Sequence, residues 1–225
     1  MRRKDYLSIV LVFFILLVFQ DIHAQQAEIF SEAKGTPTAA ERIYDYEKWN
    51  FSIDNNQYEI KKNGKAKRID EKNRVTNFYI NLKDADNLVR IYFAQYKNDL
   101  ILLCEDEAWD AGGGFIIRLD GKILKPKWRE HIPAFNIARG LIEGNSAYLA
   151  AIGFAAKINL DTGKYIWKHD NFYRRYKEDG AFTVFDVPEI QEETIVFTEK
   201  SIYDRPPNII KFNKNSGDVI QVSVN

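Results

Sequence analysis

Residues Ala155–Trp167 read Ala-Ala-Lys-Ile-Asn-Leu-Asp-Thr-Gly-Lys-Tyr-Ile-Trp. Apolar residues stand on both sides of the polar turn Asn159–Gly163. Glycine at the end of such a turn allows the positive φ that a tight β connection needs. The Asp and Thr side chains can also bond the backbone of the turn itself. This stretch therefore predicts two short strands joined by a tight turn, with Trp167 closing the second strand.

Weaker copies of this pattern recur along the chain. They are Ile209–Ile220, Phe115–Leu124, which is followed by Trp128, and the faintest, Tyr58–Lys65. The turn glycines Gly64, Gly121, Gly163 and Gly217 lie 57, 42 and 54 residues apart. A period of this size, with about four strands in each unit, is typical of β-propeller blades. The sequence thus predicts an all-β fold, a small β-propeller of about four blades.

The middle copy resembles the blade motif of the quinoprotein-like (PQQ-like) β-propeller superfamily. In that family an Ala-x-Asp-x-x-Thr-Gly-Lys-x-x-Trp run docks the tryptophan of each blade against its neighbour. Thr162, Gly163, Lys164 and Trp167 match this motif, whereas Asn159 replaces its Asp and Lys157 its Ala. The resemblance covers roughly Leu88–Val224. It implies turn or docking roles for Asn159, Thr162, Gly163, Trp167, Gly121, Trp128 and Gly217. An unrelated β-sandwich with Asp-Gly and Thr-Gly hairpins is the alternative.

The strand pattern predicts an incomplete first blade over Trp49–Ile69, followed by three fuller blades. The second covers Leu88–Trp128, the third Arg139–Trp167 and the fourth Thr183–Val224, with short apolar runs rich in β-branched and aromatic residues. Pairing of the last strand, Val219–Val224, with the first blade would close the ring and remove the sheet edges. In an open ring, the N-terminal segment or another subunit must cover those edges.

The N-terminus has the pattern of a cleavable signal peptide. Arg2-Arg3-Lys4 precedes the thirteen-residue apolar run Leu7–Phe19, which is shorter than a membrane-spanning helix. We expect cleavage after Ala24 and a periplasmic or secreted protein with no stable membrane anchor; an uncleaved anchor is the alternative. Residues 1–24 form the signal peptide, 25–44 an N-terminal segment or linker, and 45–225 the propeller-like domain. A capping-box pattern favours a short helix over Ala39–Trp49, although its aromatics suit a strand equally.

Charge and cysteine content limit the possible partners and chemistry of the chain. Without the signal peptide, the chain has 29 basic and 30 acidic side chains, so we expect no nucleic-acid partner. The single cysteine, Cys104, lies in an apolar run and is expected to be a buried, inert thiol. The run Lys61–Arg68 could contact an anionic polymer or lipid, or could simply keep an exposed hairpin soluble.

The candidate binding residues come from four stretches that the predicted strand order places on one face. These are Glu105–Gly113, Arg129–Pro133, Asp170–Gly180 and Lys200–Pro207. Loops on a rigid β scaffold commonly carry binding sites, and aromatic and arginine side chains anchor protein interfaces. The predicted partner-binding residues are Glu105, Asp106, Glu107, Trp109, Asp110, Arg129, His131, Tyr173, Arg174, Arg175, Tyr176, Tyr203 and Arg205.

Catalytic and metal-binding signals are weak. The acidic cluster Glu105–Asp110 lacks the spacing of an EF-hand loop, and His131 and His169 show no metal-ligand spacing. A glycosidase-type carboxylate pair depends on distance in space and not on sequence spacing. The resembling quinone enzymes are larger, eight-bladed rings, many with adjacent cysteines at the cofactor, so we expect no cofactor and no metal here.

The sequence therefore predicts an exported, non-catalytic binding or scaffold protein that holds an unidentified protein partner on its loop face. An immunity or inhibitor protein would be one specific form. The alternative is a glycan-binding or glycan-hydrolysing protein with its site in the acidic loop. A third possibility is an assembly subunit with open sheet edges.

Overall fold

The computed structural model of the chain describes residues 27–37, 46–83, 87–107, 112–170, 184–200 and 207–223. Within these ranges the chain forms strands and turns and no helix. No helix that is long and apolar enough to cross a bilayer occurs among the residues described. The predicted signal peptide, residues 1–24, lies outside the described residues.

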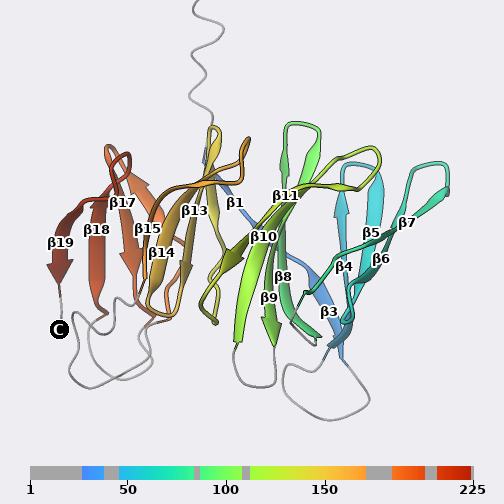
Figure 1. The fold of residues 1–225 in the computed structure, drawn as a ribbon, viewed down its shortest axis with the longest axis horizontal. Coiled ribbons are helices and arrows are strands. Elements are labelled where there is room, and N and C mark those ends of the chain that lie inside the picture. Colours follow the sequence, from blue (N-terminus) through green and yellow to red (C-terminus); the bar gives the residue numbers. More distant parts are fainter. Residues whose placement is uncertain are drawn as a thin grey trace, which may run out of the picture.

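Four antiparallel sheets stand side by side as the blades of a β-propeller-like fold (Figure 1). Blade I contains β3 (Lys34–Pro37), β4 (Tyr46–Ile53), β5 (Asn56–Lys61), β6 (Lys65–Ile69) and β7 (Val75–Tyr79). Blade II contains β2 (Ser31–Glu32), β8 (Asn87–Tyr96), β9 (Asp99–Glu107), β10 (Gly112–Leu119) and β11 (Pro126–Ile132). Blade III contains β1 (Glu28–Ile29), β12 (Leu141–Glu143), β13 (Ser146–Ala151), β14 (Phe154–Asn159) and β15 (Tyr165–His169). Blade IV contains β16 (Glu189–Gln191), β17 (Thr194–Thr198), β18 (Ile209–Asn213) and β19 (Val219–Ser223).

The turn predicted at Asn159–Gly163 forms as expected and recurs in two other blades. The Gly163 amide donates to the Asn159 carbonyl over 2.8 Å, and Gly217 does the same to Asn213 over 2.9 Å. In blade II the equivalent donor is Leu124, which bonds the Asp120 carbonyl over 2.8 Å. All three donors have positive φ, 70°, 77° and 56° for Gly163, Gly217 and Leu124.

Two of the turn glycines in the predicted repeat therefore belong elsewhere. Gly121 stands three residues before the positive-φ position, and it must be glycine because a Cβ there would collide with the Asn98 carbonyl oxygen. Gly64 lies between β5 and β6, a different connection of the blade. The matching turn of blade I is Asp70–Arg74, where Asn73 adopts a φ of 57°.

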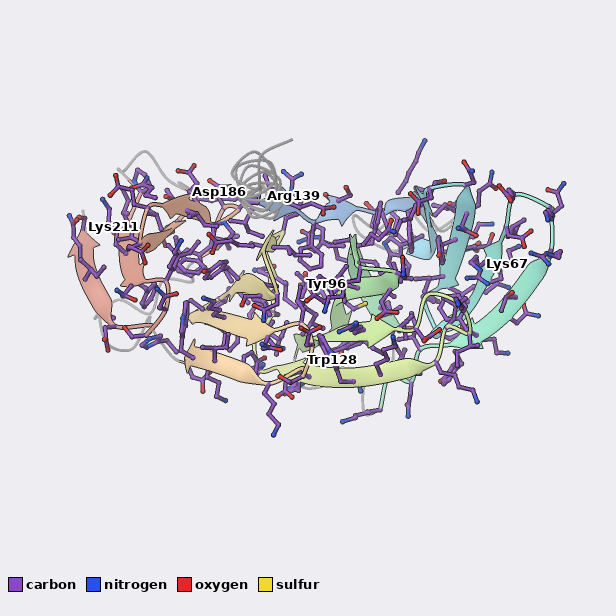
Figure 2. The ribbon with its side chains drawn as sticks, turned by 90° about the horizontal axis from the view of Figure 1, so that it is seen from above. Lys67, Tyr96, Trp128, Arg139, Asp186 and Lys211 are labelled. Atoms are coloured by element: carbon purple, nitrogen blue, oxygen red, sulfur yellow. The ribbon has the colours of Figure 1, made fainter. Side chains whose placement is uncertain are left out.

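Residues 28–37 form a strap along the inner edge of the row, which Figure 2 shows from above. The strap strands β1, β2 and β3 pair with β12, β8 and β4, which are the next strands along the chain in blades III, II and I. Phe30 lies between β1 and β2, and Ala33 between β2 and β3. They are 0% and 5% exposed and belong to the apolar clusters between neighbouring blades. The linker that the sequence predicts over residues 25–44 is thus, where it is described, a set of sheet strands.

The predicted closure of the ring, by pairing of the last strand with the first blade, does not occur among the described strands. β19 pairs only with β18, and blade I lies at the other end of the row from blade IV (Figure 1). The structure has the open alternative, in which the N-terminal segment covers inner edges. The first blade is also fuller than predicted, because β7 completes it. Among the described residues of blade IV the first strand is β16. Of the predicted strand Thr183–Pro188 the structure describes residues 184–188, in which an isolated bridge joins Phe185 to Glu199.

Candidate functional site

One side chain from the strand before the outermost strand of a blade, β6, β10 or β14, fastens that blade to the next one. Arg68 donates to the Gly121 carbonyl over 2.5 Å, Arg118 to the Leu160 carbonyl over 2.8 Å, and Lys157 to the Lys214 carbonyl over 3.0 Å. The three carbonyls occupy the same position in three successive turns. The sequence signal is a cation, an apolar residue and Asp or Asn, repeated at Arg68, Arg118, Lys157 and Lys211.

Tryptophans strengthen two of these joints. The indole N–H of Trp128 donates to the Leu160 carbonyl over 2.9 Å, and that of Trp167 to the Lys214 carbonyl over 3.2 Å. Their rings cover Gly163 and Gly217, where an added Cβ would lie 2.5 Å from a ring carbon. These contacts join the blades at the ends that carry the turns beginning at Asp120, Asn159 and Asn213, which we call the turn-bearing ends. The loops of the candidate site lie at the opposite ends of the blades.

The joint between blades II and III also buries an ion-pair network. Arg118 lies 2.6 Å and Lys127 2.9 Å from the Asp99 carboxylate, which also accepts the Gly121 amide at 3.1 Å. Burial alone would raise the pKa of Asp99, but the hydrogen bonds from Lys127, Arg118 and Gly121 outweigh it and the pKa is lowered. Every group in this network has partners, so its role is structural.

The candidate site lies at the other end of blade II, where β9, β11, β15 and β17 all end on one side of the row (Figure 1). β9 ends in Glu105, Asp106 and Glu107, opposite Gly114, Gly113 and Gly112 of β10. Successive residues of a strand point to opposite faces, so Glu105 and Asp106 do not converge.

Glu105 faces blade III and serves as an anchor. Its carboxylate accepts the Asn136 amide at 3.0 Å and lies 3.4 Å from Arg90, and its side chain is 8% exposed. Burial raises its pKa, against the opposing effects of Arg90 and of the Asn136 and Ile137 amides. Glu105 therefore ties blade II to the chain entering blade III and is not available to a partner.

Asp106 faces the other way, toward Arg129 and His131, and these three residues form the blade II corner. The guanidinium carbon of Arg129 lies over the Phe115 ring, 3.9 Å from its centroid. A Cβ at Gly113 would lie 3.5 Å from His131 Cε1 and 3.7 Å from Asp106 Oδ1, so both side chains border this glycine. Burial raises the pKa of Asp106, with Arg129 and His131 opposing it. His131 is exposed.

Most of the other predicted site residues lie outside the ranges that the structure describes. Glu107 is described only as part of β9. The residues outside the described ranges are Trp109, Asp110, Tyr173, Arg174, Arg175, Tyr176, Tyr203 and Arg205. His169 lies at the joint of blades III and IV, with Nε2 2.7 Å from the Gly217 carbonyl. Among the described residues no group of three or more His, Cys, Asp and Glu side chains could hold a metal. Cys104 is fully buried, and burial raises its pKa.

The fold is similar to that of a quinohemoprotein alcohol dehydrogenase from Comamonas testosteroni, at a TM-score of 0.50 and 11% identity. The match covers 88% of this chain and 37% of the dehydrogenase. A computationally designed protein, Ika8, and a chain of the mitotic checkpoint complex match at TM-scores of 0.35, with 11% and 12% identity. These matches cover 77% and 80% of this chain, and 60% and 65% of the others. No family model and no curated protein matches the sequence.

Proposed function

We propose that the chain is an exported, non-catalytic binding protein of the PQQ-like propeller superfamily, which holds a protein partner on the loop-bearing ends of its blades. The blade II corner is the observation that carries this proposal. The Arg129 guanidinium lies over the Phe115 ring, beside an exposed His131 and a buried Asp106. Preordered arginine and aromatic groups are the anchors that protein interfaces use.

The energetics of Asp106 support a role beyond folding. Its raised pKa means that folding disfavours the ionised form of the Asp106 carboxylate. The lowered pKa of Asp99, on the same strand, means that folding favours the ionised form there. A buried charge that lowers stability is commonly kept for binding or chemistry. A cationic group on a partner would offset this cost.

The geometry gives no comparable support to a glycan hydrolase or a cation-dependent lectin. Either activity in the acidic loop would use convergent carboxylates, but the two acidic side chains of this loop that the structure describes, Glu105 and Asp106, point to opposite faces of β9. Glu105 is also already bonded to Arg90 and Asn136. The protein-binding proposal needs only the Asp106 face.

Affinity purification of residues 25–225 from an envelope extract of the native cell, read by mass spectrometry, tests the proposal. We expect one stoichiometric protein partner, whose recovery falls at least tenfold with Arg129→Ala plus His131→Ala. The matched control, Lys122→Ala plus Lys164→Ala, changes two exposed cations at the turn-bearing ends and should retain the partner. Recovery of no partner, or equal recovery with both double variants, would contradict the proposal.

A further inference from the structure

Blade I turns a lysine-rich face away from the rest of the molecule. Along its strands, Trp49, Tyr58 and Ile60 point into the apolar cluster shared with blade II. The alternate positions therefore point outward, at the end of the row where Figure 2 labels Lys67. The outward positions include five lysines, which we name the lysine face: Lys34, Lys48, Lys61, Lys65 and Lys67.

The charge of this face is concentrated and only partly balanced. Glu59 is the one acidic residue among its described strand positions, and it lies 2.9 Å from Lys48 and 3.3 Å from Lys67. Lys48 and Lys61 stand directly opposite each other in the register of β4 and β5. Like charges placed opposite one another destabilise a sheet. The full chain has no net charge, so the excess is local to this face.

Two exposed apolar side chains border the lysines. Val75 and Tyr79 of β7 are 57% and 55% exposed, and Tyr79 stands opposite Lys65 in the register. Protein interfaces are depleted in lysine, so this composition does not fit a protein partner. An array of lysine ammonium groups beside an exposed tyrosine fits an anionic bilayer surface, where tyrosine sits at the level of the headgroups.

We propose that the lysine face of blade I docks on a lipid bilayer that contains anionic lipids. The docking is peripheral and electrostatic, and it is separate from the binding of a protein partner by the blade II corner. Glu59 weakens it, because its carboxylate neutralises part of the charge of Lys48 and Lys67. The attraction falls as salt screens it.

Sedimentation of residues 25–225 with vesicles of phosphatidylglycerol and phosphatidylcholine tests this inference. We expect binding at 50 mM salt that is lost on pure phosphatidylcholine vesicles. The triple variant Lys34→Gln, Lys61→Gln and Lys65→Gln should lower the partition coefficient about 100-fold, at roughly fivefold for each lysine. Glu59→Gln should raise it several-fold.

The matched control is Lys122→Gln, Lys125→Gln and Lys164→Gln, which removes three exposed lysines from the turn-bearing ends of blades II and III. It should bind nearly as well as the unchanged chain. No binding to anionic vesicles, or an equal loss with both triple variants, would overturn the inference. So would retention on soluble polyglutamate or heparin without binding to the vesicles, since that would assign the face to a polymer.

Discussion

Two buried aspartates of the same strand are in opposite electrostatic situations. Asp99 begins β9 and lies 2.6 Å from Arg118, whereas Asp106 near its end lies in a space bordered by Gly113 and His131. Hydrogen bonds from Lys127, Arg118 and Gly121 lower the pKa of Asp99 although burial opposes them. Burial raises the pKa of Asp106. The difference identifies Asp99 as a structural residue and Asp106 as one that folding alone does not explain.

Neutralising these two carboxylates should therefore change stability in opposite directions. Asp99→Asn should lower the free energy of unfolding at pH 7 by about 3 kcal/mol, as expected when one partner of a buried ion pair is removed. Asp106→Asn should raise it, because the folded state disfavours the ionised form. Urea denaturation at pH 7 measures both, and a destabilised Asp106→Asn would contradict the argument.

The same two variants have a defined pH dependence. The contribution of Asp99 is present above the pKa of an unfolded Asp, about 3.9, and is lost as the pH falls through its lower folded pKa. The cost of Asp106 appears as the pH rises from about 3.9 through its higher folded pKa. Both differences from the unchanged chain should therefore shrink in acid, which denaturation curves at pH 3 and pH 7 would show.

Gly163 is required for both its backbone conformation and its contact with Trp128. Gly163→Ala should cost about 2 to 4 kcal/mol of stability, because the left-handed conformation is strained for alanine and its Cβ meets the indole ring. The control is Glu192→Gly, at an exposed turn residue with a φ of 53°. It should be neutral or slightly stabilising in urea denaturation, since glycine relieves strain there. A harmless Gly163→Ala would contradict the role given to the docking turn.

At the scale of elements, the sequence predicted strands well wherever their pattern was strongly apolar. Blade III and the inner strands of blade II match the expected runs, because β9, β10, β13 and β14 are buried on both faces. The outer strand of blade II was misplaced: β11 covers Pro126–Ile132, so it extends past Trp128 and includes most of the predicted loop Arg129–Pro133. β7 was missed because Val75–Tyr79 has one solvent-facing side and no turn glycine. The strap was missed because its strands β1, β2 and β3 are too short to show a strand pattern in the sequence. Their positions depend on the distance between neighbouring blades, which is a property of the tertiary structure.

The strap makes a direct prediction for two adjacent residues. Phe30→Ala should lower the unfolding free energy by about 3 to 5 kcal/mol, because Phe30 is fully buried between blades II and III. Ile29→Ala, next to it and 48% exposed, should change it by no more than about 0.5 kcal/mol. Thermal or urea denaturation compares them. Equal effects would show that the strap does not pack between the blades.

At the scale of the whole molecule, the described residues form an open row of four blades, and the N-terminal strap joins three of these blades along their inner edge. The sequence predicted the blade repeat but aligned it on Gly64 and Gly121, because glycine is visible in a sequence and positive φ at Leu124 or Asn73 is not. It grouped the candidate site residues by loop, whereas the faces of β9 separate Glu105 from Asp106. Which side a strand residue faces depends on register, and register became visible only with the paired strands.

The pairing of the strap with blade I tests this account most directly. Lys34 stands opposite Asn50 in the register of β3 and β4. Opposite residues of antiparallel strands are close enough for a disulfide, at about 4.5 to 5.5 Å between Cα atoms. The double variant Lys34→Cys, Asn50→Cys should therefore oxidise to an internal disulfide in the folded protein, as the mass before and after reduction would show. The control pair Lys34→Cys, Ser52→Cys, two residues out of register, should stay largely reduced. Oxidation of both pairs alike, or of neither, would contradict the strap.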